Sequence, residues 1–199
     1  MRLLMNGRYF QLIDEEFLKT LPVKSFDGNI HLIDEPGKLD SIKKILLKES
    51  VLGFDTETKP SFKKGKYNKV AMLQLATDKS AYLIRLNKVI LPGFIIKIME
   101  DPGVTKVGVA IKDDLRSLCK IKPFNPDGFV ELQEFVKEYG IEDNGLKKLV
   151  ANVLGFRISK KNQTSNWERE VLTEEQLRYA ATDAWTCLRI YRHLKENQS

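Results

Sequence analysis

The sequence holds few of the residues that cross-link a chain or bind soft metals, with two cysteines and two histidines among 199 residues. Cys119 and Cys187 lie far apart, so they give no disulfide framework, and we expect two buried free thiols in a reducing compartment. His31 and His193 are the only nitrogen ligands that could join them, which is too scattered a set for a zinc site. Any metal bound here is therefore expected to have oxygen ligands.

Long apolar runs are also missing. No stretch approaches the ~20 apolar residues needed to cross a bilayer, and residues 1–17 show neither a long apolar segment nor a small-residue cleavage site. We therefore expect a protein without a membrane span or signal peptide, located in the cytoplasm. The sequence contains no internal repeat, low-complexity tract or Pro/Gly/Ser-rich linker. Its length suits one domain over residues 26–199 with an N-terminal appendage over residues 1–25.

Basic residues are in modest excess. Lysine and arginine number 33 against 27 aspartates and glutamates, which gives a net charge of +6. Hydrophobic residues make up 42% and charged residues 30% of the chain, an ordinary composition for a soluble globular protein. The basic balance is compatible with a nucleic-acid partner, although charge alone is weak evidence for one.

The hydrophobic periodicity indicates alternating strands and helices. Strands are expected over residues 30–33, 51–55, 70–77, 80–86 and 104–110. Helices are expected over 36–48, 92–101, 113–120, the second half of 129–140, 145–155 and a final segment that begins after Thr173. The tight connection at Asp78-Lys79 indicates a hairpin, and Thr173 with Gln176 forms a capping-box pattern. This order predicts an α/β fold with a mixed sheet.

Two acids stand at the end of the predicted strand 51–55. Asp55 and Glu57 are two residues apart, so on a strand their side chains project from the same face. The carboxyl end of such a strand is the usual place for ligands in α/β sheets. The alternative is a strand that runs out into a polar turn with both acids solvated.

Two further regions place acids near structured elements. On the final helix, Tyr179 and Asp183 are four residues apart and share a face close to the inward alanine stripe. An inward acid is costly unless it is paired or bound to metal, although a hydrogen bond to tyrosine or backbone would also satisfy it. Asp113 and Asp114 follow a strand and open a helix. We interpret Asp113 as an N-cap or first-turn acid, while Asp114 has a structural and a functional interpretation of similar weight.

Carboxylates that converge in one cleft repel one another, and a hard divalent cation such as Mg²⁺ or Mn²⁺ compensates that repulsion well. Two such ions roughly 4 Å apart can activate a water and stabilise the leaving oxygen of a phosphodiester. Clustered acids alone can thus support phosphodiester hydrolysis.

Three ordered motifs carry a resemblance to a known family. DTE at 55–57, GVAIKDDL at 108–115 and YAATD at 179–183 resemble the three motifs of the DEDDy-type 3′-5′ exonucleases. This family includes ribonuclease D, the proofreading domain of DNA polymerase I and the exonuclease domain of the Werner syndrome helicase. GKYNKVAMLQLA (65–76), SNW (165–167) and LTEEQLRYAATDA (172–184) are similar to the helicase pattern. The resemblance covers about residues 28–196.

This resemblance implies a ribonuclease-H-like fold, a mixed sheet flanked by helices. It also implies 3′-5′ hydrolysis of DNA or RNA with release of nucleoside monophosphates and two divalent metal ions. Asp55, Glu57 and Asp183 would hold the metal that activates water. Asp55 would bridge to the second metal, which Asp114 would also reach, and Tyr179 would orient the attacking water.

The chain departs from the family pattern at one position in the second motif. Ala110 stands four residues before Asp114, where proofreading domains commonly carry asparagine.

Residues around the motifs are candidates for contact with nucleic acid. They are Lys63, Lys64, Lys66, Leu75, Lys160, Lys161 and Trp167. The lysines would contact backbone phosphates or simply be solvated. Leu75 would be a base-stacking wedge or a core residue, and Trp167 would stack on a terminal base or pack.

Two other functions stay open at this point: a binding or scaffold module with an inactive nuclease fold, and a phosphodiesterase acting on a small nucleotide. The complete acid set argues against the first, and the flanking basic loop favours a polymer substrate over the second.

Overall fold

A mixed sheet forms the centre of the computed structural model, which describes residues 4–5, 9–60 and 68–197. Within these residues the strand order is β3 (Asn29–Ile33), β6 (Ser80–Arg85), β5 (Val70–Ala76), β4 (Val51–Thr58), β7 (Thr105–Gly108) and β8 (Phe129–Glu131). The central strands β6, β5 and β4 are antiparallel, and β3, β7 and β8 join their neighbours in parallel. The predicted α/β fold with a mixed sheet is confirmed.

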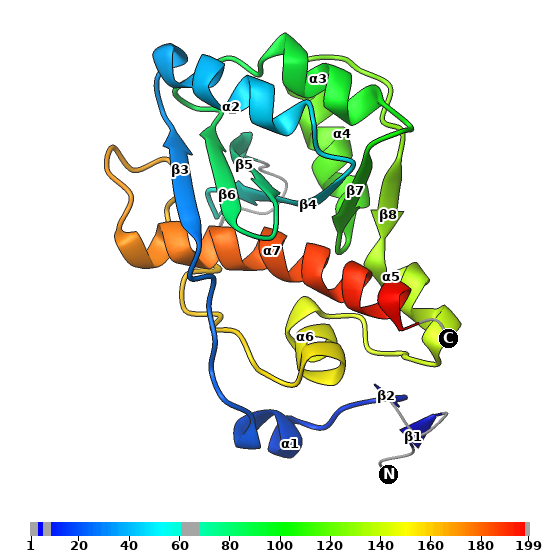
Figure 1. Cartoon of the computed structure of the whole chain (residues 1–199). Helices are drawn as coiled ribbons and strands as arrows, with labels where there is room; N and C mark the ends of the chain where they lie inside the picture. Colours follow the sequence, from blue (N-terminus) through cyan, green and yellow to red (C-terminus); the bar gives the residue numbers. More distant parts are fainter. Residues whose placement is uncertain (1–3, 6–8, 61–67, 198–199) are drawn as a thin grey trace.

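Helices cover both faces of this sheet (Figure 1). On one face lie α2 (Leu39–Leu46), α3 (Gly93–Glu100) and α4 (Ile111–Ile121). The long helix α7 (Glu174–Glu196) crosses the other face, with α6 (Leu146–Leu154) beneath it. Strand β4 alternates between the two sides, because Leu52 and Phe54 enter the core under α2 to α4 while Gly53 meets α7.

Gly53 allows α7 to lie directly on the central strand. A Cβ atom built on Gly53 would stand 1.9 Å from the carbonyl oxygen of Ala184, an impossible contact. The buried alanines Ala180, Ala181 and Ala184 complete this close approach from the helix side. The small residues therefore bring α7, and the acid it carries, against the strand that carries Asp55.

Most of the predicted elements are confirmed with shifted ends. The hairpin of β5 and β6 and the capping box of Thr173 and Gln176 are present as predicted. The segment 36–48 begins as a 3-10 turn (Pro36–Lys38) before α2, and 129–140 divides into β8, α5 (Leu132–Phe135) and a 3-10 turn (Val136–Tyr139).

Asp113 is a first-turn acid, one of the two structural roles expected for it, and is not the N-cap. Helix α4 starts two residues earlier and is capped at Ala110, so Asp113 is an exposed first-turn acid paired with Arg116 at 3.1 Å. The acidic pair made the helix start look later than it is.

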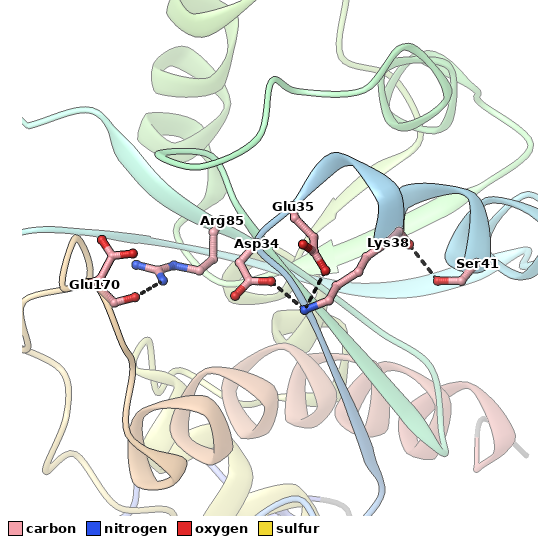
Figure 2. Close-up of polar contacts among 6 residues, drawn as sticks. All are labelled: Asp34, Glu35, Lys38, Ser41, Arg85 and Glu170. Carbon is pink, nitrogen blue, oxygen red and sulfur yellow. Dashed lines mark hydrogen bonds and ion pairs between the residues drawn. The ribbon is translucent and has the colours of Figure 1, made fainter.

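A buried arginine fixes the segment that enters α7. Arg85, at the end of β6, is 1% exposed, and its guanidinium donates to the carbonyl oxygens of Glu170, at 2.8 Å, and of Arg169. Figure 2 shows the contact of Arg85 with Glu170 beside Lys38, whose ammonium bridges Asp34 at 2.8 Å and Glu35 at 3.6 Å. Because Glu170 follows Trp167 closely in the chain, Arg85 holds the path between the SNW motif and α7.

The N-terminal residues pack beneath α6. They contain β1 (Leu4–Met5), β2 (Tyr9–Phe10) and α1 (Glu15–Thr20), and α1 lies below α6 in Figure 1. The division into an appendage over 1–25 and a domain over 26–199 stays a prediction. In the part of the chain that the structure describes, no helix combines the length and apolar character needed to cross a membrane.

Candidate active site

Three of the four predicted acids come together between β4 and α7. Asp55, Glu57 and Asp183 each offer a carboxylate oxygen, and these oxygens all lie within 4.8 Å of one another. Asp55 and Glu57 share the face of β4 on which Gly53 meets α7. The side-chain alternation of a strand and the close seating of a helix therefore build this cluster.

The fourth acid, Asp114, lies on the other side of β4. It belongs to α4, which packs on the opposite face, and its carboxylate accepts a hydrogen bond from the hydroxyl of Thr56. Thr56 alternates with Asp55 along the strand, so the two contact opposite sides of it. Asp114 is thus next to the cluster without offering an oxygen within it.

Burial disfavours negative charge at all four acids, and repulsion from the neighbouring carboxylates of the site adds to it at Asp55 and Glu57. Burial, followed by repulsion from Asp183 and Asp114, raises the pKa of Asp55 well above its usual range. Burial and the neighbouring carboxylates raise the pKa of Glu57 to about 10. Burial also raises the pKa of Asp183 to about 7 and that of Asp114 to about 6. At neutral pH the cluster is therefore stable only if some of its carboxylates are protonated or a cation balances their charge.

Tyr179 lies one helical turn before Asp183 and shares a hydrogen bond with its carboxylate. The tyrosine ring packs on Trp167, with the ring centroids 6.0 Å apart. Burial, and then the charges of Asp183 and Glu57, raise the pKa of Tyr179 above its usual value. The phenol consequently keeps its proton and acts as a hydrogen-bond donor rather than a base.

A buried amide beside the cluster was missed as a site residue by sequence reasoning. Gln74 on β5 pairs in register with Asp55 and is 0% exposed. Among the described residues neither its amide nitrogen nor its amide oxygen has a hydrogen-bond partner. The alternation of Gln74 with the core residues Leu73 and Leu75 is the signal that could have placed it on the acidic face.

These observations fit a divalent metal ion. The donors are hard carboxylate oxygens, which magnesium and manganese prefer. These oxygens lie within 4.8 Å of one another, so their negative charges repel unless a cation balances them. The orphaned amide of Gln74 is a further sign that the site is completed by a group with its own polar shell.

Asp55, Glu57 and Asp183 open into a cavity of about 300 Å³, which Asp114 does not line. Beyond the acids and Tyr179, its lining includes Val109, Gly145, Leu146, Lys147, Ile158, Ser159, Lys160 and Gln163. The positive charge of Lys160 lowers the pKa of Asp183 against the effect of burial, which puts this lysine close to the acids. Lys161 does not line this cavity and pairs instead with Glu175 at 3.1 Å.

Two predicted nucleic-acid contacts are wrong. Leu75 and Trp167 are both 0% exposed, so neither can stack on a base. Leu75 points into the core under α2 to α4, and Trp167 packs beneath α7 with Met72 and Leu83. Their apolar character reflects core packing.

Two further sets of predictions concern the loop lysines and the cysteines. Lys63, Lys64 and Lys66 lie outside the described residues. Cys119 and Cys187 are free thiols, as expected, although only Cys187 is fully buried and Cys119 is partly exposed.

Comparison with known proteins places the chain in a family. The 3′-5′ exonuclease family matches residues 30–198. The chain is 35% identical over 165 residues to a putative 3′-5′ exonuclease of Acanthamoeba polyphaga mimivirus, covering 75% of this chain and 41% of that protein. It is 34% identical over 184 residues to the bifunctional 3′-5′ exonuclease/ATP-dependent helicase WRN of Mus musculus, covering 87% of this chain and 13% of that protein. The chain thus spans less than half the length of these two relatives.

Solved structures agree. The EXO domain of Aedes aegypti Nibbler superposes with a TM-score of 0.77 at 29% identity, covering 88% of this chain and 94% of that one. Escherichia coli RNase D shares the fold with a TM-score of 0.76 at 24% identity, over 84% of this chain and 44% of that one.

The chain therefore belongs to the 3′-5′ exonuclease family, in its DEDDy branch, and has a ribonuclease-H-like fold. Members of this family use divalent metals, in keeping with the acidic cluster described above.

Proposed function

We propose that this enzyme removes nucleotides from the 3′ end of DNA or RNA with two divalent ions, Mg²⁺ or Mn²⁺, and releases nucleoside monophosphates. The observation that carries the proposal is the cluster of the partly buried Asp55 with the buried Glu57 and Asp183, open to a cavity that Lys160 also lines. A cytoplasmic location stays a prediction from the sequence.

Asp55, Glu57 and Asp183 would hold one ion, and Asp55 with Asp114 the other. When bound, such ions supply a nucleophilic water and neutralise charge on the leaving oxygen. Asp114 would have to give up its hydrogen bond from Thr56, at least in part, to take this role.

The chain's own residues orient the reacting groups. The Tyr179 hydroxyl keeps its proton and is held against Asp183, so it would orient the attacking water as a hydrogen-bond partner. Lys160 would attract the phosphate into the cavity, since an ammonium beside carboxylates offsets their repulsion of an anion. The cavity volume of about 300 Å³ is at the small end of the ~300–1,000 Å³ range of ligand pockets, which suits a single terminal nucleotide.

The decisive experiment uses single-stranded and duplex oligonucleotides of DNA and RNA, labelled at the 5′ end, with EDTA, Mg²⁺ or Mn²⁺. We expect a labelled ladder that shortens from the 3′ end, unlabelled mononucleotides when the digest is separated by chromatography, and full dependence on the added metal. Cleavage in EDTA would refute the metal mechanism. Hydrolysis of dinucleotides alone would favour a phosphodiesterase for small nucleotides, and binding without cleavage would favour a scaffold function.

A further inference from the structure

Two segments far from the acids in sequence form one wall of the cavity. We define the wall as residues 142–147, which end in the first two residues of α6, and residues 157–160, which follow α6. Gly145, Leu146 and Lys147 line the cavity from the first segment, and Ile158, Ser159 and Lys160 line it from the second. Neither segment belongs to the sheet or to α7. Leu146 and Lys147 begin α6, which packs against α7, and the loop residues before and after this helix depend on other contacts.

Residues 9–24, which we call the brace, contact the first wall segment by a series of hydrogen bonds. The Glu142 amide donates to the Gln11 carbonyl oxygen at 2.9 Å, and the Gln11 side-chain amide donates to the Glu142 carboxylate at 2.6 Å. Two residues on, the amide of Ile13 donates to the carboxylate of Asp143 at 2.9 Å. Lys147, a cavity residue, pairs with Glu15 of the brace at 3.4 Å.

The brace then holds the second wall segment at Arg157. The Arg157 amide donates to the Pro22 carbonyl oxygen at 2.9 Å, and the Lys24 amide donates to the Arg157 carbonyl oxygen at 3.0 Å. The guanidinium of Arg157 adds a bond to the Leu21 carbonyl oxygen at 3.1 Å. Val23 and Arg157 thereby form a parallel bridge immediately before Ile158, the first cavity residue of this segment.

Apolar packing and buried charge make these contacts part of the fold. Ile13 and Leu18 are 3% and 1% exposed and pack on Ala151 of α6. Asp143 is 2% exposed, and apart from Ile13 its carboxylate meets Lys148 at 3.3 Å. Loss of the brace would expose this apolar patch and remove a hydrogen bond from a buried carboxylate, which is costly.

We propose that the brace positions the substrate wall of the active site, so that residues 9–24 determine how well the enzyme holds the nucleic-acid end. The kinetic part of this inference rests on the proposed function. The hydrogen bonds of the brace described above go to the wall, while the acids lie on β4, α4 and α7. The brace also precedes residue 30, where the match to the exonuclease family begins.

The test compares Leu18→Ala with Leu46→Ala in the full-length chain. Both leucines are 1% exposed or less, but Leu46 is the last residue of α2 and packs into the core on the opposite face of the sheet. We expect Leu18→Ala to raise KM for an oligonucleotide by about 5- to 50-fold, below the ~100-fold loss that a 1 Å misplacement can bring. The value of kcat and the affinity for Mn²⁺ should change less than about twofold, because the groups used in the transition state stay in place. The matched control Leu46→Ala should lose similar thermal stability without a change in KM.

A gentler variant and a second readout keep the inference testable if Leu18→Ala folds poorly. Gln11→Ala removes the side-chain bond to Glu142 at a surface position and should raise KM in the same direction by a smaller factor. Hydrogen exchange should become faster at residues 142–147 and 157–160 in both brace variants and stay unchanged there in the control.

Equal KM changes in Leu18→Ala and Leu46→Ala, or unchanged KM and exchange in the brace variants, would overturn the proposal. If the wild-type chain cleaves no nucleic acid, the proposed function fails, and the exchange measurements still decide whether the brace holds the wall.

Discussion

The two sides of strand β4 hold their acids in different ways. On the α7 side, Asp55, Glu57 and Asp183 converge with little to balance their charge beyond Tyr179 and Lys160. On the α4 side, Asp114 stands apart and is satisfied by the hydroxyl of Thr56. The first side is therefore ready to bind a cation, whereas the second needs a side-chain rearrangement. The active site is therefore preorganised for a cation on the α7 side and not on the α4 side. Strand β4 contributes to both sides, with Asp55 and Glu57 on the first and Thr56 on the second.

The largest expected effect comes from removing an acid on the prepared side. Asp183→Ala or Asp55→Ala should lower the rate by several orders of magnitude while the protein stays folded, because one fewer carboxylate relieves repulsion in the metal-free cluster. Turnover on labelled oligonucleotides and a thermal melt measure the two parts. Normal turnover in either variant would refute their place in the metal site.

On the α4 side, the neighbouring residues Asp113 and Asp114 allow a direct comparison of an exposed acid with a candidate ligand. Asp114→Ala should be severe, since Asp114 faces β4, and Asp113→Ala should change the rate little, since an exposed ion pair with Arg116 is worth only ~0–1 kcal/mol. Turnover at saturating metal separates them. The reverse order of severity would show that Asp113 is the ligand.

Tyr179→Phe is expected to have an intermediate effect. It keeps the ring that packs on Trp167 and removes the hydroxyl held at Asp183, so the rate should fall by roughly 10- to 1,000-fold, around the range of a positioned acid–base group. Affinity for Mn²⁺ should change little, as the carboxylates remain. Unchanged turnover would mean that Tyr179 only packs, and lost metal binding would mean that its hydroxyl supports the ligands.

The charge difference between the two sides also predicts how stability depends on pH. Without metal, the folded-state pKa is about 7 for Asp183 and about 6 for Asp114, both above the usual value of 3.8. The folded state therefore binds more protons than the unfolded state in this window, so stability falls as pH rises from about 4 through about 7. The Tm in EDTA should drop over this range, drop less steeply in Asp183→Asn, where Asp114 still titrates, and flatten with Mg²⁺. A Tm in EDTA that rises with pH throughout the range would contradict this.

The smallest effect concerns the backbone that leads into α4. Ala110 adopts a left-handed conformation with φ of 57°, which is unfavourable for alanine. Ala110→Gly should stabilise the protein by roughly 0.5–1 kcal/mol, because glycine adopts this conformation freely. Ala110→Asn should act in the same direction, and Ala110→Val should act in the opposite one. Chemical denaturation measures all three, and a destabilised glycine variant would show that the strain is compensated elsewhere.

Local patterns in the sequence predicted most of the strands and helices and the acids that are candidate metal ligands. The hairpin, the capping box and the shared face of Asp55 and Glu57 depend on neighbours within a few residues, so they could be read directly. The start of α4 could not, since two acids at 113–114 imitate a helix start that the backbone places at Ala110. The burial of Leu75 and Trp167 could not be settled either, because leucine and tryptophan occur both in cores and in binding sites, so the residue type does not distinguish the two roles.

The sequence by itself carried the resemblance to the family, predicted most of the strands and helices, and offered the acidic residues as candidates, since motifs and periodicity are local patterns. Only the tertiary structure decided that three acids converge while Asp114 bonds Thr56, that Gln74 lies unpaired opposite Asp55, and that residues 9–24 hold the cavity wall. Each of these features joins segments distant in the chain. Such contacts depend on how closely helices and strands approach one another, as Gly53 of β4 approaches Ala184 of α7. A local sequence pattern does not predict the distance between two elements.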